Sequence, residues 1–240
     1  MAFTELRRVA WDTETTSPNP LEARIVTAAI IIRGNGPNRI FSYLINPGVP
    51  IPPEAAAIHG IDDAKAQAEG QDPKAALEDI AQRLAVAIRA RMPVIAFNTA
   101  YDWTVLNCEL ARHDLPTMGE RLDYTDPITL IDPHVLDKQL ITRLRGTGQR
   151  KLKPTCHRYG VQLTNWHTAE ADALAALLLT DAQMQRHPQL LDMGPVQLYR
   201  AQRTWRAEQQ AGLQEWLRRT NPAAHCAPEW PLLTAQGVSA

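Results

Sequence analysis

The segment "RVAWDTETTS" (residues 8–17) places two carboxylates at the end of an apolar run. Successive side chains of a strand point to opposite faces, so Asp12 and Glu14 share one face. Two anions this close repel each other, and burial strengthens the repulsion. Two interpretations are open at this point: a strand end that frays into solvent, or a pair of ligands for a divalent cation.

The composition bounds the class of protein. The chain has 240 residues, which suits one α/β domain with an appendage or two small domains, and its 45% hydrophobic share can bury a sizeable core. With a net charge of −1, any nucleic-acid binding needs a local basic patch. Three distant cysteines without C-x-x-C spacing argue against a disulfide framework or zinc knuckle. We expect a cytoplasmic protein with no membrane partner, because neither a signal-peptide core nor a run of about 18 apolar residues is present.

The periodicity of the chain predicts an α/β fold. Three strands are expected near the N-terminus, and a "NGPN" turn joins the last two, so they form an antiparallel meander. Two later strands alternate with helices, which favours a mixed sheet that continues with parallel strands and carries helices on its faces. The segment 47–61 is rich in proline and holds at most a short helix. The expected strands are 6–11, 23–33, 39–46, 93–98 and 128–132, and the expected helices are 72–92, capped by Asp72, then 99–115 and 168–187.

A domain boundary is expected near "HPQLLDMGP" (187–195). Residues 1–190 would form one domain, and residues 191–240 a C-terminal helical extension and tail. Within the extension, 198–220 reads as one long helix whose apolar stripe packs on the domain or on a second subunit. Its five arginines against two glutamates leave contact with nucleic acid as an alternative. The tail that follows has few structural signals, and we expect it to lie loosely on the surface.

Three further residues are candidates for the same site as Asp12 and Glu14. Asp102 lies in the first turn of a helix that Thr99 is expected to cap, after a strand end, where α/β sheets gather ligands; a capping-box carboxylate is the alternative. His167 and Asp172 are five residues apart, too divergent on one helix to share a target. If Thr168 caps that helix, His167 lies just outside it and Asp172 projects from the helix among small apolar residues.

Together these motifs resemble those of a known enzyme family. "DTET" (12–15), "NTAYD" (98–102) and "HTAEAD" (167–172) resemble the three motifs of the DEDDh 3′–5′ exonucleases, relatives of the proofreading subunit of bacterial DNA polymerase III. "IHGI" (58–61) and "RKLKPTCHRYGVQL" (150–163) resemble that family's loop after the third strand and its stretch before the last motif. The likeness spans about residues 6 to 186.

The resemblance implies a ribonuclease-H-like fold and two divalent cations, Mg²⁺ or Mn²⁺. Asp12, Glu14 and Asp172 would hold the first cation, and Asp12 would bridge to the second, with Asp102 assisting through water. Hard cations of this kind prefer oxygen ligands. His167 would be the general base that takes a proton from the attacking water, since a tyrosine-type relative would carry tyrosine where this chain has Thr168.

The same resemblance implies a set of substrate contacts. The segment around Thr13, Thr15 and Thr16 would hold the terminal 3′ nucleotide, and His59, Gly60 and Ile61 would contact its base, with Ile61 as a wedge. The acid-free run "RLRGTGQRKLKPTCHR" (143–158) is either a solvated face or a set of phosphate contacts. Trp103 and Trp166 flank the motifs and either stack on bases or pack in the core. The substrate-binding candidates are Thr13, Thr15, His59, Gly60, Ile61, Lys151 and Lys153.

The sequence therefore predicts a metal-dependent 3′–5′ exonuclease that acts on single-stranded ends, with DNA ahead of RNA. The same chemistry on short RNA or RNA ends is the first alternative, since the motifs do not separate the two. A non-catalytic module that binds nucleic acid or a polymerase is the second, and its signature would be the loss of an acid or of the histidine. A DNA polymerase or a homodimer partner is left open, as is the pathway, whether repair, proofreading or RNA turnover.

Overall fold

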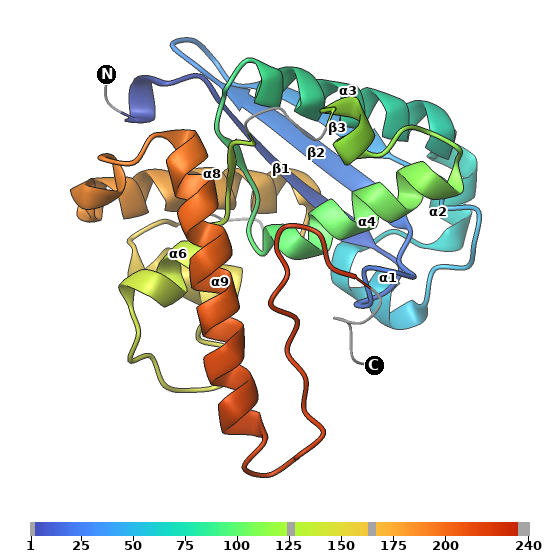
Figure 1. Ribbon diagram of the computed structural model, residues 1–240. Helices are drawn as coiled ribbons and strands as arrows, with labels where there is room; N and C mark the ends of the chain where they lie inside the picture. Colours follow the sequence, from blue (N-terminus) through green and yellow to red (C-terminus); the bar gives the residue numbers. More distant parts are fainter. Residues whose placement is uncertain (1–2, 124–127, 163–166, 235–240) are drawn as a thin grey trace.

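The computed structural model describes residues 3–123, 128–162 and 167–234 and contains the predicted mixed sheet (Figure 1). Its strand order is β3-β2-β1-β4-β5. β1 pairs antiparallel with β2, and β2 with β3, whereas β4 runs parallel to both β1 and β5. The strands are β1 Arg8–Thr15, β2 Ile25–Arg33, β3 Arg39–Leu44, β4 Val94–Ile95 and β5 Leu130–Ile131. The first three strands and the parallel continuation are confirmed, although β4 and β5 are shorter than predicted.

Strand β1 continues through both carboxylates rather than ending before them. Asp12 lies opposite Ala29 of β2 and Glu14 opposite Thr27, and the pairing becomes irregular only between Glu14 and Thr15. The two acids therefore sit on the regular ladder, on the same face of the sheet. The interpretation of a frayed strand end is wrong, because the neighbouring β2 holds this part of β1 in register.

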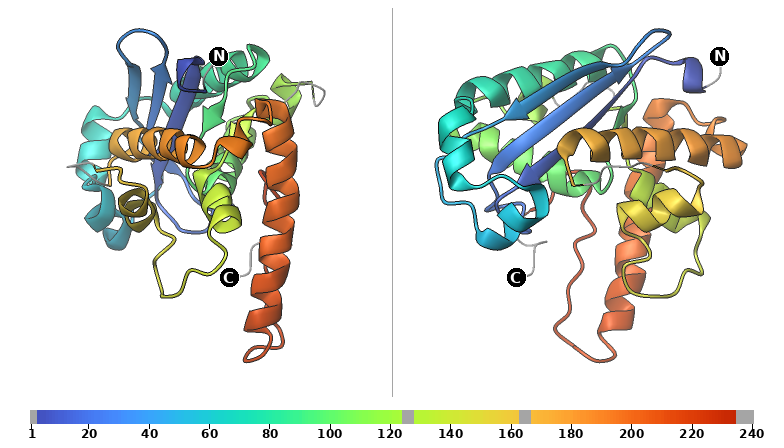
Figure 2. Two further views of the ribbon diagram at one scale, coloured as in Figure 1. Left: turned by 90° about the vertical axis from the view of Figure 1, so that its left-hand side faces the viewer. Right: turned by 180° about the vertical axis from the view of Figure 1, so that it is seen from behind.

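Helices cover both faces of the sheet (Figure 2). On one side, α3 (Pro73–Arg89) and α4 (Thr99–Arg112) pack on Val9 and Trp11 of β1. The Trp11 and Trp103 rings meet edge to face with centroids 6.4 Å apart, so the core interpretation of Trp103 is confirmed. On the other side, α8 (Ala169–Arg186) packs on Ala10, whose side chain shares its face with Asp12 and Glu14.

The ends of two of the predicted helices are confirmed, and one is corrected. Asp72 caps α3 by accepting from Ala75 N, and Thr168 caps α8 by accepting from Ala171 N. The predicted cap of α4 by Thr99 is wrong. Its N-cap is Asn98, in the left-handed region with φ 60°, and the first amides of the helix donate to the carboxylate of Asp132, which is distant in sequence.

The remaining helices are short and connect the main elements. They are α1 Pro53–His59, α2 Asp63–Glu69, α5 Met118–Arg121, α6 Pro133–Leu140 and α7 Leu152–Arg158, with 3₁₀ turns at Phe3–Glu5 and Pro188–Leu190. The short helix expected within 47–61 is α1. The sequence did not indicate α2, because it buries only Ala66 and so shows no apolar stripe. Among the described residues, no helix is both long and apolar enough to cross a bilayer.

The C-terminal segment begins with the long predicted helix, α9 (Pro195–Leu217), which lies along the β5 edge of the sheet (Figure 1). Its apolar stripe is packed only in its first half: Leu198 is buried, whereas Leu213 and Trp216 are 41% and 61% exposed. The expectation of a loose tail is wrong for the part of the tail that the structure describes. The chain returns along α9, and Trp230 is buried against the Tyr199 ring at a centroid distance of 5.3 Å.

Candidate active site

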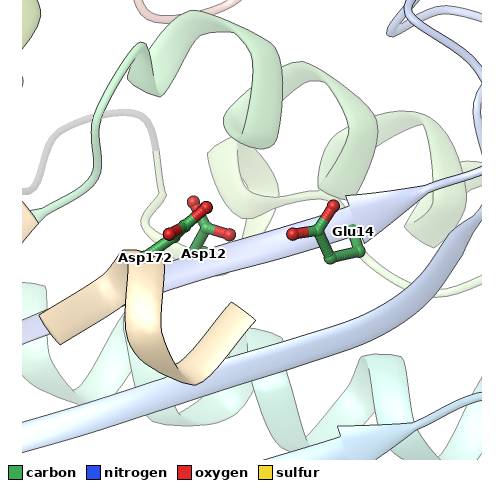
Figure 3. Close-up of side chains that lie close together, drawn as sticks. All are labelled: Asp12, Glu14 and Asp172. Carbon is green, nitrogen blue, oxygen red and sulfur yellow. The ribbon is translucent and has the colours of Figure 1, made fainter. Parts of the chain in front are cut away.

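Three of the predicted acids gather in the structure (Figure 3). Asp12 and Glu14 come from β1 and Asp172 from the first turn of α8, and each offers a carboxylate oxygen within 4.8 Å of the others. Figure 3 shows the Asp172 carboxylate beside that of Asp12, with Glu14 further along the strand. Two local features produce this arrangement. Side chains alternate between the two faces along β1, and the cap at Thr168 starts α8 just before Asp172.

Asp102 approaches the same acids from the α4 side of the sheet. It is buried, and its Oδ1 accepts hydrogen bonds from Thr13 N at 3.1 Å and Thr13 Oγ1 at 2.7 Å. It lies outside the three-residue group, yet its charge acts on both Asp12 and Glu14. The Thr13 side chain, a predicted substrate contact, is buried, and its hydroxyl is engaged by Asp102.

Burial raises the pKa of every acid in the site, and repulsion from the neighbouring acids adds to this for Asp12 and Glu14. Burial, then the charges of Asp102, Asp172 and Glu14, hold the pKa of Asp12 well above its ordinary value. Burial and the same neighbouring acids raise the pKa of Glu14 to about 7. Burial raises the pKa of Asp102 to about 7 against the hydrogen bonds from Thr13, and burial also raises that of Asp172. Without a counter-ion, the site therefore resists full ionisation at neutral pH.

The donor set fits a hard divalent cation. All ligand atoms in the group are carboxylate oxygens, the donors that Mg²⁺ and Mn²⁺ prefer. Within the described residues, Asp172 Oδ1 is a buried oxygen without a hydrogen-bond partner. A buried anionic oxygen is costly unless it is paired, so a cation at this position would resolve both the repulsion and the missing partner.

His167 lies at the mouth of this group, immediately before the cap of α8. Its backbone is in the left-handed region with φ 63°, and its side chain is exposed. The backbone and the imidazole of His167 both lie close enough to the Asp172 carboxylate to lower the pKa of that acid. The geometry expected from a Thr168 cap is therefore present. Trp166, for which the sequence predicted either base stacking or core packing, lies outside the described residues.

Tyr101 is a site residue that sequence reasoning missed. It directly precedes Asp102 on α4, and its hydroxyl forms hydrogen bonds with Thr15 Oγ1 and Ser17 O. Burial raises the pKa of Tyr101 to about 12, so the phenol stays neutral and can donate. The Thr15 hydroxyl, a predicted substrate contact, is thus engaged within the protein. The only sequence signal was the position of Tyr101 inside "NTAYD".

A cavity of about 500 Å³ opens beside Glu14, between the sheet and the start of α8. Small residues of β2 form its floor, and His59 and Ile61 lie at its wall, so the structure brings the "HGI" loop to the acids. His59 Nδ1 accepts from Ile61 N at 3.2 Å, and Gly60 ends α1 with φ 74°. Ile61 is only 9% exposed and packs in a small apolar cluster, which limits how far it projects as a wedge.

The predicted basic run 143–158 divides into two parts. Lys151 and Lys153 are exposed at the start of α7. Arg150 and Arg158 instead form ion pairs with Asp137 of α6, which is fully buried, at 2.8 and 2.9 Å. The charge of these two arginines neutralises a buried carboxylate, whereas the phosphate contacts of Lys151 and Lys153 stay a prediction.

Comparison with known families finds one that matches most of the chain. The family model RNase_T, described as "Exonuclease", matches residues 9–180, which contain all the acids and His167. No curated protein matches the chain in sequence.

Solved structures share the fold at low sequence identity. Exonuclease I from Methylocaldum szegediense is 21% identical with a TM-score of 0.63, covering 77% of this chain and 42% of that one. E. coli Exonuclease I in complex with a dT13 oligonucleotide is 20% identical with a TM-score of 0.62, covering 78% and 43%. Exonuclease X in complex with 5′ overhanging duplex DNA is 20% identical with a TM-score of 0.53, covering 75% and 92%. The chain thus matches less than half the length of Exonuclease I.

Proposed function

The chain belongs to the exonuclease family of the RNase_T model, and we propose that this 3′–5′ exonuclease shortens single-stranded DNA from its 3′ end with two divalent cations. The observation that carries the proposal is the meeting of Asp12, Glu14 and Asp172 within 4.8 Å, with Asp102 behind them. A non-catalytic module is disfavoured, since it would have no use for carboxylates whose repulsion only destabilises the fold.

The protein's own residues have separate tasks. Asp12, Glu14 and Asp172 would hold one cation, and Asp12 with Asp102 would hold the second. When bound, such cations screen the phosphodiester and stabilise the attacking and leaving oxygens of an in-line displacement. Thr13 keeps Asp102 oriented through its two hydrogen bonds, and Tyr101 keeps the segment after β1 against α4.

His167 would take the proton from the attacking water. An exposed imidazole beside the acids can exchange that proton with solvent after each turnover. A histidine placed as a general base contributes about 10² to 10⁴ in rate.

DNA is proposed ahead of RNA because solved structures with this fold include complexes with a dT13 oligonucleotide and with 5′ overhanging duplex DNA. The cavity beside Glu14 would receive the terminal nucleotide. Contacts to a 2′-hydroxyl would distinguish the exoribonuclease alternative. The DNA polymerase and homodimer partners stay predictions.

The test uses 5′-labelled single-stranded DNA and RNA of the same sequence, with Mg²⁺ or Mn²⁺. We expect a ladder that shortens from the 3′ end, faster on DNA, and lost on chelation. Asp12→Asn should abolish it, and His167→Gln should slow it about 10²-fold or more. Asp192→Asn and His225→Gln, at exposed positions, are matched controls that should retain activity. Degradation by Asp12→Asn at the rate of the parent would refute the proposed site.

A further inference from the structure

The start of α4 is held by a carboxylate from the far edge of the sheet. Asp132 follows β5 and is buried. Its Oδ1 accepts from Asn98 N at 2.9 Å and its Oδ2 from Thr99 N at 3.0 Å. These bonds satisfy the first amides of α4 and fix the left-handed turn at Asn98, a conformation that costs free energy for a residue other than glycine. Asp132 therefore sets where α4 begins.

Asp102 depends on that starting point. It lies one helical turn after Asn98, and Tyr101 N already donates to Asn98 O at 2.9 Å. A rigid-body shift of α4 would separate the Asp102 carboxylate from Thr13 of β1 and from the acids beyond it. The link runs from Asp132 through the Asn98 turn to Asp102.

The C-terminal helix completes the support of Asp132. Gln202 of α9 is fully buried, and its Oε1 accepts from Asp132 N at 2.7 Å. Its Nε2 donates to Leu130 O at 3.1 Å and to Leu198 O at 3.1 Å. β5 is an edge strand, so these N–H and C=O groups would otherwise face a missing neighbour. The Gln202 amide takes the place that the peptide group of a further strand would have.

A second tether joins the returning segment to α4 itself. Leu233 N donates to Thr104 Oγ1 at 2.9 Å, and Thr104 is fully buried two residues after Asp102. Trp230 packs into the core cluster to which α3 and α4 contribute. Residues far beyond the matched family region of 9–180 thus reach α4 at two places, directly and through Asp132.

We propose that residues 195–234 are a positioning element of the active site. Gln202 holds α4 through Asp132, and the Leu233 backbone holds it through Thr104. Together they set the position of Asp102 opposite β1. The expected effect on catalytic rate rests on the proposed function, whereas the expected effect on the position of α4 does not. Gln202, Asp132 and Thr104 are positioning residues, since none of them faces the cavity beside Glu14.

The test compares two glutamines of α9. Gln202→Leu keeps the volume and removes the bonds to Asp132 and Leu130. Gln209→Leu is the matched control, because Gln209 Nε2 donates its hydrogen bond to Val135 O of α6 at 3.1 Å and not to β5 or α4. In the metal-free protein, amide hydrogen exchange of residues 98–104 should quicken about tenfold in Gln202→Leu and stay at the parent rate in Gln209→Leu. With Mn²⁺ and single-stranded DNA, Gln202→Leu should lower kcat about tenfold at an unchanged KM and weaken Mn²⁺ binding in calorimetry.

Thr104→Val provides a second variant, since it removes the acceptor of Leu233 N with little change in shape. It should quicken exchange at Leu233 and lower kcat several-fold while the protein stays folded by circular dichroism. The proposal is overturned if amide exchange of residues 98–104 in Gln202→Leu is as slow as in the parent protein. It is also overturned if Gln202→Leu and Gln209→Leu lose kcat equally. If the parent protein degrades neither DNA nor RNA, the proposed function fails, whereas the exchange measurements still decide the positioning role.

Discussion

Replacing Glu14 by glutamine should stabilise the metal-free protein at alkaline pH. Burial and the charges of Asp172 and Asp102 raise the pKa of Glu14 from 4.5 to about 7 in the folded protein. Between these values the folded state binds more protons than the unfolded state, so the free energy of unfolding falls as pH rises. Glutamine keeps the shape of the side chain but does not ionise, so Glu14→Gln avoids this loss.

The size of the effect follows from the two pKa values. Each pH unit between them is worth about 1.4 kcal/mol, which gives a limit of about 3 kcal/mol above pH 7. Solvent reaches part of the Glu14 side chain, so we expect about 2 kcal/mol. For a chain of this size, that corresponds to a rise in Tm of about 4–8 °C. At pH 4 the carboxyl is largely protonated in both states, and the two proteins should be nearly equally stable.

The assay is thermal or urea unfolding with chelator present, at pH 4 and pH 8. Glu22→Gln, at an exposed position before β2, is the matched control and should leave the pH dependence of the parent unchanged. Mn²⁺ should then stabilise the parent more than Glu14→Gln, since the cation binds the folded state through this carboxylate. The reasoning is refuted if Glu14→Gln is no more stable than the parent at pH 8, or if its advantage is the same at pH 4.

Three other predictions test residues around the site. Tyr101→Phe removes the hydrogen bonds that hold the segment after β1, so kcat/KM on single-stranded DNA should fall about tenfold in steady-state assays, and an unchanged value would contradict this role. Asp137→Asn leaves Arg150 and Arg158 without their buried counter-charge and should lower the free energy of unfolding by about 3 kcal/mol in urea. Trp230→Ala should cost about 3–5 kcal/mol and Trp216→Ala less than about 0.5 kcal/mol, because the first ring is buried and the second exposed.

Local patterns were sufficient to predict the five strands, the long helices and the candidate acids. Alternation along β1 placed Asp12 and Glu14 on one face, and the capping residue Thr168 placed His167 and Asp172 at the start of α8. Each of these features depends on residues within about one turn or one strand. The resemblance to the exonucleases then named the same residues, and the structure brings three of the four acids into one group.

The errors concern interactions between residues distant in the chain. The cap of α4 comes from Asp132, 33 residues after Thr99, so a local search selected Thr99 itself. Tyr101 contacts Thr15 across 86 residues, and no local pattern marks that pair. The tail was expected to be loose because it has few structural signals, yet Trp230 packs into a core site formed by α9 and α4. Such contacts follow from the fold and not from sequence spacing.

The repulsion among the acids and the anchoring of α4 should be thermodynamically coupled. The acids come from separate elements, with Asp12 and Glu14 on β1, Asp102 on α4 and Asp172 on α8. Because the charge of Asp102 acts on Glu14, ionisation of both pushes α4 away from β1. The bonds through Asp132 and Gln202 oppose that movement.

A double-mutant cycle of Glu14→Gln and Gln202→Leu measures this coupling. With chelator at pH 8, Gln202→Leu should destabilise the parent by about 0.5–1 kcal/mol more than it destabilises Glu14→Gln, because the neutral side chain removes part of the force on α4. At pH 4, where Glu14 is protonated, the difference should vanish. A coupling energy of the same size at both pH values would mean that packing, and not charge, connects the two positions. Anchoring by the C-terminal segment would then be independent of the charge in the site. Only the contacts between α8 and β1 would oppose the repulsion among the acids.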